Sequence, residues 1–354
     1  MGYLLALFNW IIFVIEVSRA FTSTVRSMTT YVLAMFRPPP PPRDVRDKVV
    51  VVTGAATGLG SEISKRFALL GAQVIMLDID EEANRQAANE LRHLGYNRVL
   101  SFPCDVSNEN EVNAIAVRTL KYFGKVDILV NNAAWWEPMM ASPLIQSPSE
   151  AIHRTININL LSHFWMTRAF LPSMIERRSG HVVAISSPSG LMGNSAKFSS
   201  FCASQHVVIG AMSALACELE DYPSIRLCTA CCPVVVGASS SPITSANGVE
   251  VGKCAAPNGL LAHIRKLLGL ELPPLNEQAA AIVDAIRRDR DFVFVPKGFI
   301  ILQFIEQLFP QKLSKFAREL LLSECAVSQR VHTRSGTGAS ALTSARFTNG
   351  NSCH

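Results

Sequence analysis

Residues 49–60 constrain the fold of this chain more tightly than any other segment. Four consecutive valines, Val49–Val52, are typical of a strand that is buried on both faces of a parallel sheet. The strand runs directly into Thr53-Gly54-Ala55-Ala56-Thr57-Gly58-Leu59-Gly60, and a helical pattern begins at Ser61. Glycines at such a turn let the backbone approach a pyrophosphate, which then sits on the helix N-terminus. The segment therefore predicts a nucleotide-binding α/β domain.

Strands and helices alternate along the rest of the domain. We expect strands at 49–52, 73–77, 99–104, 127–130, 181–185 and 225–232, and helices at 61–70, 81–94, 108–123, 155–176 and 202–219. This alternation predicts an α/β fold, a Rossmann-type doubly wound parallel sheet in a single domain. The hydrophobic content of 49% is ample for its core.

The first 37 residues are predicted to be a membrane anchor region. Tyr3–Val17 is an apolar run, shorter than the roughly 20 residues that span a bilayer. No positive residue precedes it, which argues against a cleaved signal peptide. Arg19, Arg26 and Arg37 follow it, which favours a domain that faces the cytosol. We expect a retained anchor, either a short span or a hairpin in one leaflet; the alternative is a helix packed on the globular domain.

Composition marks the remaining boundaries. Five consecutive prolines, Pro38–Pro42, predict a stiff spacer inside a linker at 38–47. The nucleotide-binding domain then covers 48–325. Residues 326–354 are rich in Ser, Thr, Gly and Asn, and we expect a disordered tail there.

Charge and cysteine usage exclude several other functions. The net charge of +5 comes without a basic stripe interleaved with aromatics, so we expect no nucleic-acid partner. Cys228 and Cys231 form a C-x-x-C pair among nine cysteines, but no second ligand pair accompanies them. We therefore predict no metal site, and reduced thiols within the sheet.

Two aspartates follow strands at the edge where the nucleotide is expected. Asp78 ends the second strand, where a carboxylate can hydrogen-bond the adenine ribose hydroxyls. The same carboxylate would repel the 2′-phosphate of NADP, so NAD(H) is favoured over NADP(H). Asp105 ends the third strand in the same way and is placed to contact the adenine.

Three motifs in order carry a resemblance to a known family. The spacing Gly54-x-x-x-Gly58-x-Gly60, the triplet Cys104-Asp105-Val106 and the run Asn131-Asn132-Ala133-Ala134 resemble the short-chain dehydrogenase/reductase family over roughly residues 45–325. Ala134 stands where the family has glycine. The fold implied by the resemblance is the one expected above.

Other segments resemble the membrane-bound retinol and 17-beta-hydroxysteroid dehydrogenase branch of that family. These are His163-Phe164-Trp165, Ala169–Pro172, Leu272–Leu275 and the proline-bounded stretch Gly298–Pro310. The resemblance implies lipophilic substrates, namely retinoids, steroids or long-chain alcohols. It also implies a location at the endoplasmic reticulum or on lipid droplets.

The family's reaction depends on a tyrosine, a lysine, a serine and an asparagine. By motif, Asn159 is the asparagine and Ser187 is the serine. The Tyr-x-x-x-Lys motif is replaced by Phe201-Cys202-Ala203-Ser204-Gln205. Phenylalanine has no proton to donate, and glutamine has no charge to shift the pKa of a neighbour. Ser200 stands at the usual spacing from Ser187, where a hydroxyl could relay a proton through water.

A second departure lies after the last predicted strand. The chain reads Cys232-Pro233-Val234-Val235, with valine where the family has the glycine that passes close to the nicotinamide. The adenine half of the site is therefore expected to be intact and the nicotinamide half eroded. The candidate cofactor-binding residues are Gly54, Thr57, Gly58, Leu59, Gly60, Asp78, Asp105, Val106, Asn132, Ala133, Gln205 and Pro233.

Three functions are compatible with this pattern. The first is a working NAD-dependent oxidoreductase for lipophilic alcohols or ketones that uses an unusual proton path, and the replacements Phe201 and Gln205 are expected to reduce or abolish this activity. The second is a non-catalytic relative that binds nucleotide or lipid, and the third is a scaffold at a membrane or lipid droplet. The resemblance also implies a homodimer, or a heterodimer with a homologue, through the helix at 202–219. Residues 237–275 are expected to close over the substrate.

Overall fold

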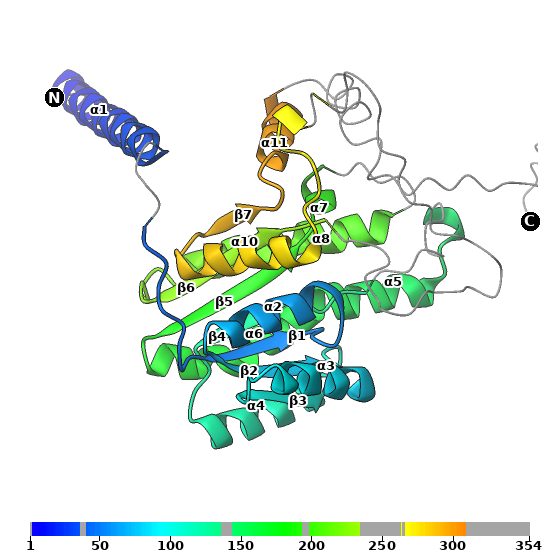
Figure 1. The fold of residues 1–354 in the computed structure, drawn as a ribbon. Helices are drawn as coiled ribbons and strands as arrows, with labels where there is room; N and C mark the ends of the chain where they lie inside the picture. The colour runs from blue at the N-terminus through cyan, green and yellow to red at the C-terminus, as the bar shows by residue number, and fades with distance from the viewer. Residues whose placement is uncertain are drawn as a thin grey trace, which may run out of the picture.

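A parallel sheet forms the centre of the computed structural model, which describes residues 2–35, 40–135, 144–192, 198–233, 263 and 266–308. Its seven strands have the order β3-β2-β1-β4-β5-β6-β7 (Figure 1). They are β1 Val49–Thr53, β2 Gln73–Asp78, β3 Val99–Pro103, β4 Ile128–Asn131, β5 Gly180–Ser186, β6 Ile225–Cys231 and β7 Phe292–Phe294. The winding reverses between β1 and β4, and ligands of such sheets bind at this switch point. The predicted Rossmann-type fold is confirmed.

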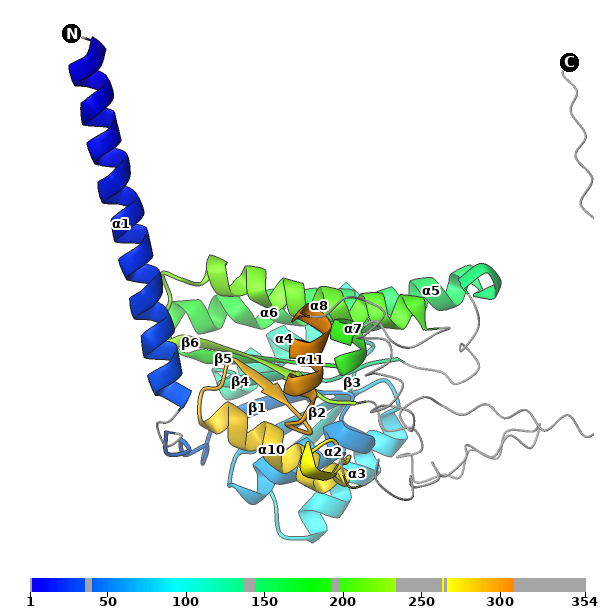
Figure 2. The same ribbon diagram turned by 90° about the horizontal axis from the view of Figure 1, so that it is seen from above.

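Two layers of helices cover the sheet (Figure 2). One layer contains α2 Gly58–Leu69, α3 Glu81–His93 and α10 Leu275–Arg287; the other contains α4 Glu109–Phe123, α6 Ser162–Glu176 and α8 Ser199–Glu218. Val50 and Val52 lie in the same core cluster as Phe67 of α2, and Val51 lies in that of Phe170 of α6. Because β1 faces a helix layer on each side, its first four side chains, Val49–Val52, are all apolar rather than alternating with polar ones.

The helix predicted at 155–176 is three elements. They are α5 Ser149–Ile156, a π-helical turn η3 Asn157–Leu161, and α6. The π turn inserts an extra residue into the helical repeat, and such turns are frequent at functional sites. Here it carries Asn159, so the local deviation from a regular helix falls on a predicted site residue.

The carboxyl-terminal part of the domain contains elements that the pattern did not predict. They are α7 Pro188–Met192, α10, β7 and α11 Phe299–Leu308, with a short 3₁₀ turn η2 at Leu144–Gln146 further upstream. β7 has only three residues and extends the sheet by pairing Phe294 with Cys231 of β6. A strand that short has too few residues to show a period.

The N-terminal segment is one continuous helix, α1 Gly2–Met35. Its described side chains are exposed, including Phe8, Trp10, Phe13 and Phe21. None of these described side chains is buried against the domain, and the helix is continuous from Gly2 to Met35, without the turn of a hairpin. Figures 1 and 2 show it projecting beside the sheet.

The end of the proline-rich linker is attached to the α10–β7 corner. The Arg43 N–H donates to the Arg287 carbonyl at 2.7 Å, and Arg287 Nε donates back to the Arg43 carbonyl at 2.8 Å. Arg288 donates to the Pro40 carbonyl at 2.6 Å, and Arg43 pairs with Asp289 at 2.5 Å. The chain that leads to α1 is thus held against the domain from residue 40 onward.

Among the described residues, α8 is the one helix that is long and apolar enough, by length and composition, to cross a bilayer. It packs against β5, β6 and α7, and its side chains Val208 and Met212 belong to the core. A core helix of this length passes the same test by composition alone.

Candidate functional site

The glycine turn after β1 lies at the carboxyl edge of the sheet. Gly54 and Gly58 have φ values of +62° and +59°, a region that favours glycine. A Cβ on Gly54 would lie 2.8 Å from Ala133 Cα, and one on Gly60 would lie 2.0 Å from the Gly54 carbonyl oxygen. Thr57 is the residue before α2, with extended backbone. The turn is compact because nothing larger than hydrogen fits, and it leaves the first N–H groups of α2 at this edge.

Thr53, the last residue of β1, connects this turn to the next strand. Its Oγ1 accepts hydrogen bonds from the N–H groups of Asn132 and Ala133, at 2.9 and 3.0 Å. Asn132 Nδ2 donates to the carbonyls of Thr53 and Gly54, at 2.9 and 3.1 Å. Asn132 and Ala133 were predicted to line the cofactor site, and their bonds show that they also hold the glycine turn. Thr53 was not predicted as a site residue.

Asp78 lies beside the glycine turn, as its position at the end of β2 predicts. Its Oδ2 accepts from the Ala56 N–H at 2.9 Å, and its Oδ1 accepts from the Asp80 N–H at 3.1 Å. Each carboxylate oxygen has a second lone pair, so Asp78 can still accept from ribose hydroxyls. The half-buried carboxylate brings a negative charge to this edge.

The end of β3 is ordered by bonds within its own turn. Asp105 Oδ1 accepts from the Ser107 N–H and hydroxyl, at 2.9 and 2.7 Å, and the Asp105 N–H donates to Glu111. Val106 is buried. Burial raises the pKa of the neighbouring Cys104 thiol to about 12, and the charges of Glu111 and Asp105 add to the rise.

The end of β5 is held tightly against α8. Ser186 Oγ donates to the Gln205 carbonyl at 3.0 Å, and a Cβ on Gly190 would lie 2.6 Å from the Gln205 carbonyl carbon. Ser187 is buried, and its Oγ accepts from the Ser189 N–H at 3.2 Å, so the hydroxyl proton remains available to a ligand. The structure therefore brings Ser187 to the helix that carries the altered motif.

Asn159 is wholly buried in the π turn, and its amide fixes the chain after β4. Its Oδ1 accepts from the Trp135 N–H at 2.6 Å, and its Nδ2 donates to the Trp135 carbonyl at 3.1 Å and to Ser204 Oγ at 3.3 Å. The guanidinium of Arg154 lies 4.8 Å above the Trp135 ring. Trp135 and Ser204 were not predicted as partners of Asn159, because the pairing joins segments far apart in sequence.

Phe201 and Gln205 lie on the first turns of α8 and are only 7% and 4% exposed. No hydrogen bond joins the Gln205 amide to another described residue. The helix also holds Ser204, whose Oγ donates to the Phe201 carbonyl at 2.7 Å. Ser200 is half-buried on the same turn. The place of a proton-donating pair is thus filled by one apolar ring and one neutral amide.

The chain after β6 is described only as far as Pro233, which is half-buried. Cys232 Sγ donates to Gln278 Oε1 at 2.7 Å, and Gln278 Nε2 donates to the Pro273 carbonyl at 2.6 Å. This link between β6 and α10 was not predicted. Val234 and Val235, most of the segment 237–275 and the tail at 326–354 lie outside the described residues.

Thiols and histidines near the sheet are neutral at ordinary pH. Burial raises the pKa values of Cys228, Cys231 and Cys232 to about 12, so these thiols are poor nucleophiles. Burial lowers the pKa of His163 to about 4. Within the described ranges, no three His, Cys, Asp or Glu side chains gather in a group that could hold a metal ion.

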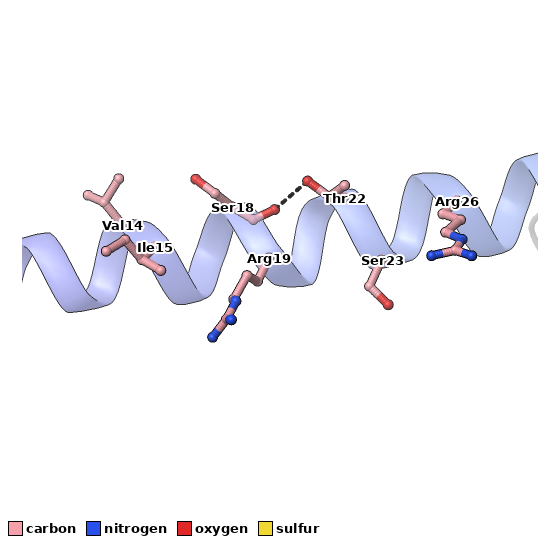
Figure 3. Close-up of a pocket in the computed structure, with 7 residues that line it drawn as sticks. All are labelled: Val14, Ile15, Ser18, Arg19, Thr22, Ser23 and Arg26. Atoms are coloured by element: carbon pink, nitrogen blue, oxygen red, sulfur yellow. Dashed lines mark hydrogen bonds between the residues drawn. The ribbon is translucent and has the colours of Figure 1, made fainter.

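A shallow hollow on α1 is separate from this site. It is lined by Val14, Ile15, Ser18, Arg19, Thr22, Ser23 and Arg26 (Figure 3). All seven residues belong to one helix, so the hollow is a feature of the helix surface and shares no residue with the edge formed by β1, β4 and β5.

Comparisons with known proteins agree with this geometry. The family model for short chain dehydrogenases matches residues 48–247. Short-chain dehydrogenase/reductase family 16C member 6 of Bos taurus is 30% identical over 79% of this chain and 82% of its own. Epidermal retinol dehydrogenase 2 of Mus musculus is 29% identical over 77% of this chain and 81% of its own. The 17-beta-hydroxysteroid dehydrogenase 13 of Rattus norvegicus is 29% identical over 77% of this chain and 83% of its own.

A solved structure of a short-chain oxidoreductase has a similar fold. A metagenomic short-chain oxidoreductase in complex with NADP superposes with a TM-score of 0.56 at 25% identity, covering 71% of this chain and 98% of the other.

Proposed function

Since this chain belongs to the short-chain dehydrogenase/reductase family, in its retinol and steroid dehydrogenase branch, we propose that it binds NAD(H) together with a lipophilic alcohol or ketone, with reduced or lost hydride transfer. The proposed loss of hydride transfer rests on the buried pair Phe201 and Gln205, which stand where the family motif has tyrosine and lysine. The proposed NAD(H) binding rests on the glycine turn and Asp78.

The adenine half of the site fits a dinucleotide. The close contacts of Gly54 and Gly60 leave a turn that only glycine can make, and α2 begins at Gly58 with its N–H groups available to a pyrophosphate. Asp78 has lone pairs left for ribose hydroxyls, and its charge would repel a 2′-phosphate. These features support NAD(H) over NADP(H).

The nicotinamide half is proposed to hold a ligand, but the two described residues at the motif positions, Phe201 and Gln205, offer no ionisable proton donor. When bound, the nicotinamide would supply or accept the hydride. Gln205 and Ser187 offer hydrogen bonds to ribose or to a substrate oxygen, but Phe201 cannot move a proton to or from that oxygen. Losing a positioned general acid typically lowers a rate by roughly a hundred- to ten-thousandfold, and the absence of the lysine adds to this.

The named relatives support the choice of ligand. They include retinol dehydrogenases and a 17-beta-hydroxysteroid dehydrogenase. We therefore propose that the ligand of this chain is a retinoid, a steroid or a long-chain alcohol, or the corresponding carbonyl compound.

Helix α1 is proposed to attach the domain to the endoplasmic reticulum or to a lipid droplet, with the domain facing the cytosol. Its described side chains from Phe8 to Val17 are exposed and mostly apolar, whereas Ser18, Arg19, Thr22, Ser23 and Arg26 form a polar stripe further along the helix (Figure 3). Within this stripe, Thr22 Oγ1 donates to the Ser18 carbonyl one turn earlier in the helix, at 2.7 Å. An apolar stretch followed by basic residues suits insertion from the cytosolic side.

Pairing of two family members is proposed to use α8. Its outward face carries small and apolar exposed residues, Ala203, Val207, Gly210 and Ala214. Small residues allow two helices to approach closely, so this face suits a second copy of this chain or a homologue.

The test measures cofactor binding and turnover on the same full-length protein in lipid nanodiscs. NADH binding is followed by fluorescence, and turnover is assayed with retinol and with a steroid alcohol. We expect the natural chain to bind NADH with little or no turnover, and the double variant Phe201→Tyr with Gln205→Lys to gain turnover. Robust turnover by the natural chain would refute the loss of activity. Failure of both proteins to bind NADH would favour the scaffold function instead.

A further inference from the structure

Helix α11 presents two different faces. Phe299 is buried in a cluster with Cys231, Leu270 and Phe294, which fixes the helix to the β6–β7 edge. On the other side, Ile300, Ile301 and Phe304 are 45%, 39% and 54% exposed. Three large apolar side chains on one short helix are an unusual exposure for a soluble surface.

The neighbouring segment enlarges this apolar face. The Gly298 N–H donates to the Gly269 carbonyl at 3.2 Å, and a Cβ on Gly298 would lie 2.2 Å from the Leu268 carbonyl oxygen. The segment at 266–270 is therefore pressed against the start of α11, and Leu267, which is almost fully exposed, extends the surface. We call Leu267, Ile300, Ile301 and Phe304 the α11 face.

The α11 face and α1 lie on the same side of the molecule. Figure 1 shows both helices beyond the β7 edge of the sheet, and both lie toward the viewer in Figure 2. The linker bonds of Pro40 and Arg43 to Arg287 and Arg288 fix the point where the chain leaves the domain, on the element just before β7. A lipid surface that holds α1 would therefore lie on the side of the molecule that carries the α11 face.

The charges beside the α11 face fit a phospholipid surface. Lys266 precedes Leu267, and Lys297 precedes α11 by two residues; both side chains are exposed. An apolar centre with basic residues at its border matches the boundary between acyl chains and anionic headgroups. Glu271, four residues after Leu267, is an exposed acidic residue at the same border, so Lys266 and Lys297 leave an excess of one positive charge among these three side chains.

We propose that the α11 face is a second lipid contact, which seats the β7 edge of the domain on the phospholipid surface that holds α1. Because α11 packs on α7, and α7 directly follows Ser187, this contact brings the predicted ligand site next to the lipid. A lipophilic ligand could then pass between bilayer and site without crossing water. The inference relies on the proposed anchoring role of α1 and on no property of the cofactor site.

The experiment places the photoreactive residue p-benzoylphenylalanine at single positions of the full-length chain, reconstituted in phosphatidylcholine–phosphatidylserine vesicles. Position 304 tests the α11 face, and position 13 in α1 reports anchoring. Positions 117 and 94 replace Val117 and Leu94, two equally exposed apolar residues on the α4 and α3 side. After illumination, mass spectrometry identifies phospholipid and protein adducts. Thermal unfolding shows that each variant keeps the fold of the parent.

We expect phospholipid adducts at positions 13 and 304 and none at positions 117 and 94. Adducts at position 13 without adducts at position 304 would overturn the second lipid contact but would still support anchoring by α1. Protein adducts alone at 304 would overturn it in favour of a second copy or another protein. An absence of adducts at both 13 and 304 would overturn the anchor and the second contact together, whatever the result for NADH binding.

Discussion

The carbonyl oxygen of Gly54 occupies the space that a side chain on Gly60 would need: a Cβ there would lie only 2.0 Å away. The same Cβ would lie 2.5 Å from Asn132 Nδ2, the atom that donates to the carbonyls of Thr53 and Gly54. Gly60 is therefore required by the contact between α2 and the end of β1, in addition to any role in binding a pyrophosphate.

Gly60→Ala is expected to lower the free energy of unfolding by about 1–3 kcal/mol, since backbone atoms on both sides would have to move. NADH binding should be lost with it. Lys65→Ala is the control, because Lys65 is an exposed residue on the same helix, α2. Urea denaturation and NADH fluorescence would check both variants. Equal stability of the two variants would contradict the contact described here.

Asp78→Asn keeps an oxygen for the Ala56 N–H but removes the negative charge. We expect NADH affinity to fall roughly ten- to hundredfold, as hydrogen bonds to a charged group contribute about 1.5–3 kcal/mol. NADPH affinity should fall less or rise, because the repulsion of a 2′-phosphate is gone. Titration of both cofactors measures the ratio. Glu82→Gln removes the same charge from an exposed site on α3 and should leave the ratio unchanged.

Asn159→Ala would leave the Trp135 N–H and carbonyl without their partners inside a buried site. We expect a loss of about 1–3 kcal/mol in the free energy of unfolding from the unpaired backbone groups, and more from the cavity. Asn157→Ala, an exposed change in the same π turn, serves as the control. If both variants unfold at the same urea concentration, Asn159 does not hold the segment after β4.

His181 on β5 should make the fold sensitive to acid. Burial, together with the charges of Arg43 and Arg226, lowers its pKa from 6.5 to about 4. The unfolded chain therefore takes up a proton near pH 6.5 while the folded chain stays neutral, so stability falls as the pH drops from 6.5 toward 4. At pH 5 the loss from this group is on the order of 2 kcal/mol.

The measurement compares urea unfolding at pH 7 and pH 5 for the parent and for His181→Gln. The variant should lose less stability between the two pH values than the parent does. His93→Gln, at the exposed end of α3, should behave like the parent. An identical pH dependence in all three proteins would show that His181 is already protonated or solvated in the folded state.

Local features explain why much of the fold was predictable. The valines of β1 are apolar because helices cover both faces, and the spacing of Gly54, Gly58 and Gly60 reflects contacts made within a few residues and with the neighbouring strand end. The motif positions of Ser187, Phe201 and Gln205 were assigned from the resemblance, and in the structure the neighbouring Ser186 bonds the Gln205 carbonyl at the start of α8.

Features that depend on distant partners were not predictable. The π turn around Asn159 does not interrupt the apolar pattern of 155–176, and the bonds of Asn159 to Trp135 join segments 24 residues apart. β7 is a strand only because Phe294 pairs with Cys231. Thr53 gains its two donors from the end of β4, which no pattern around residue 53 indicates.

The attachment of Pro40 and Arg43 to Arg287 and Arg288 also has a mechanical consequence. A pull on α1, which the proposed membrane attachment would exert, reaches the folded domain first at the end of α10. The load is shared there by two arginines and spreads into the β7 edge before it can reach β1. The strand that carries the glycine turn is therefore shielded from the motion of the tether, although it follows the tether directly in the chain.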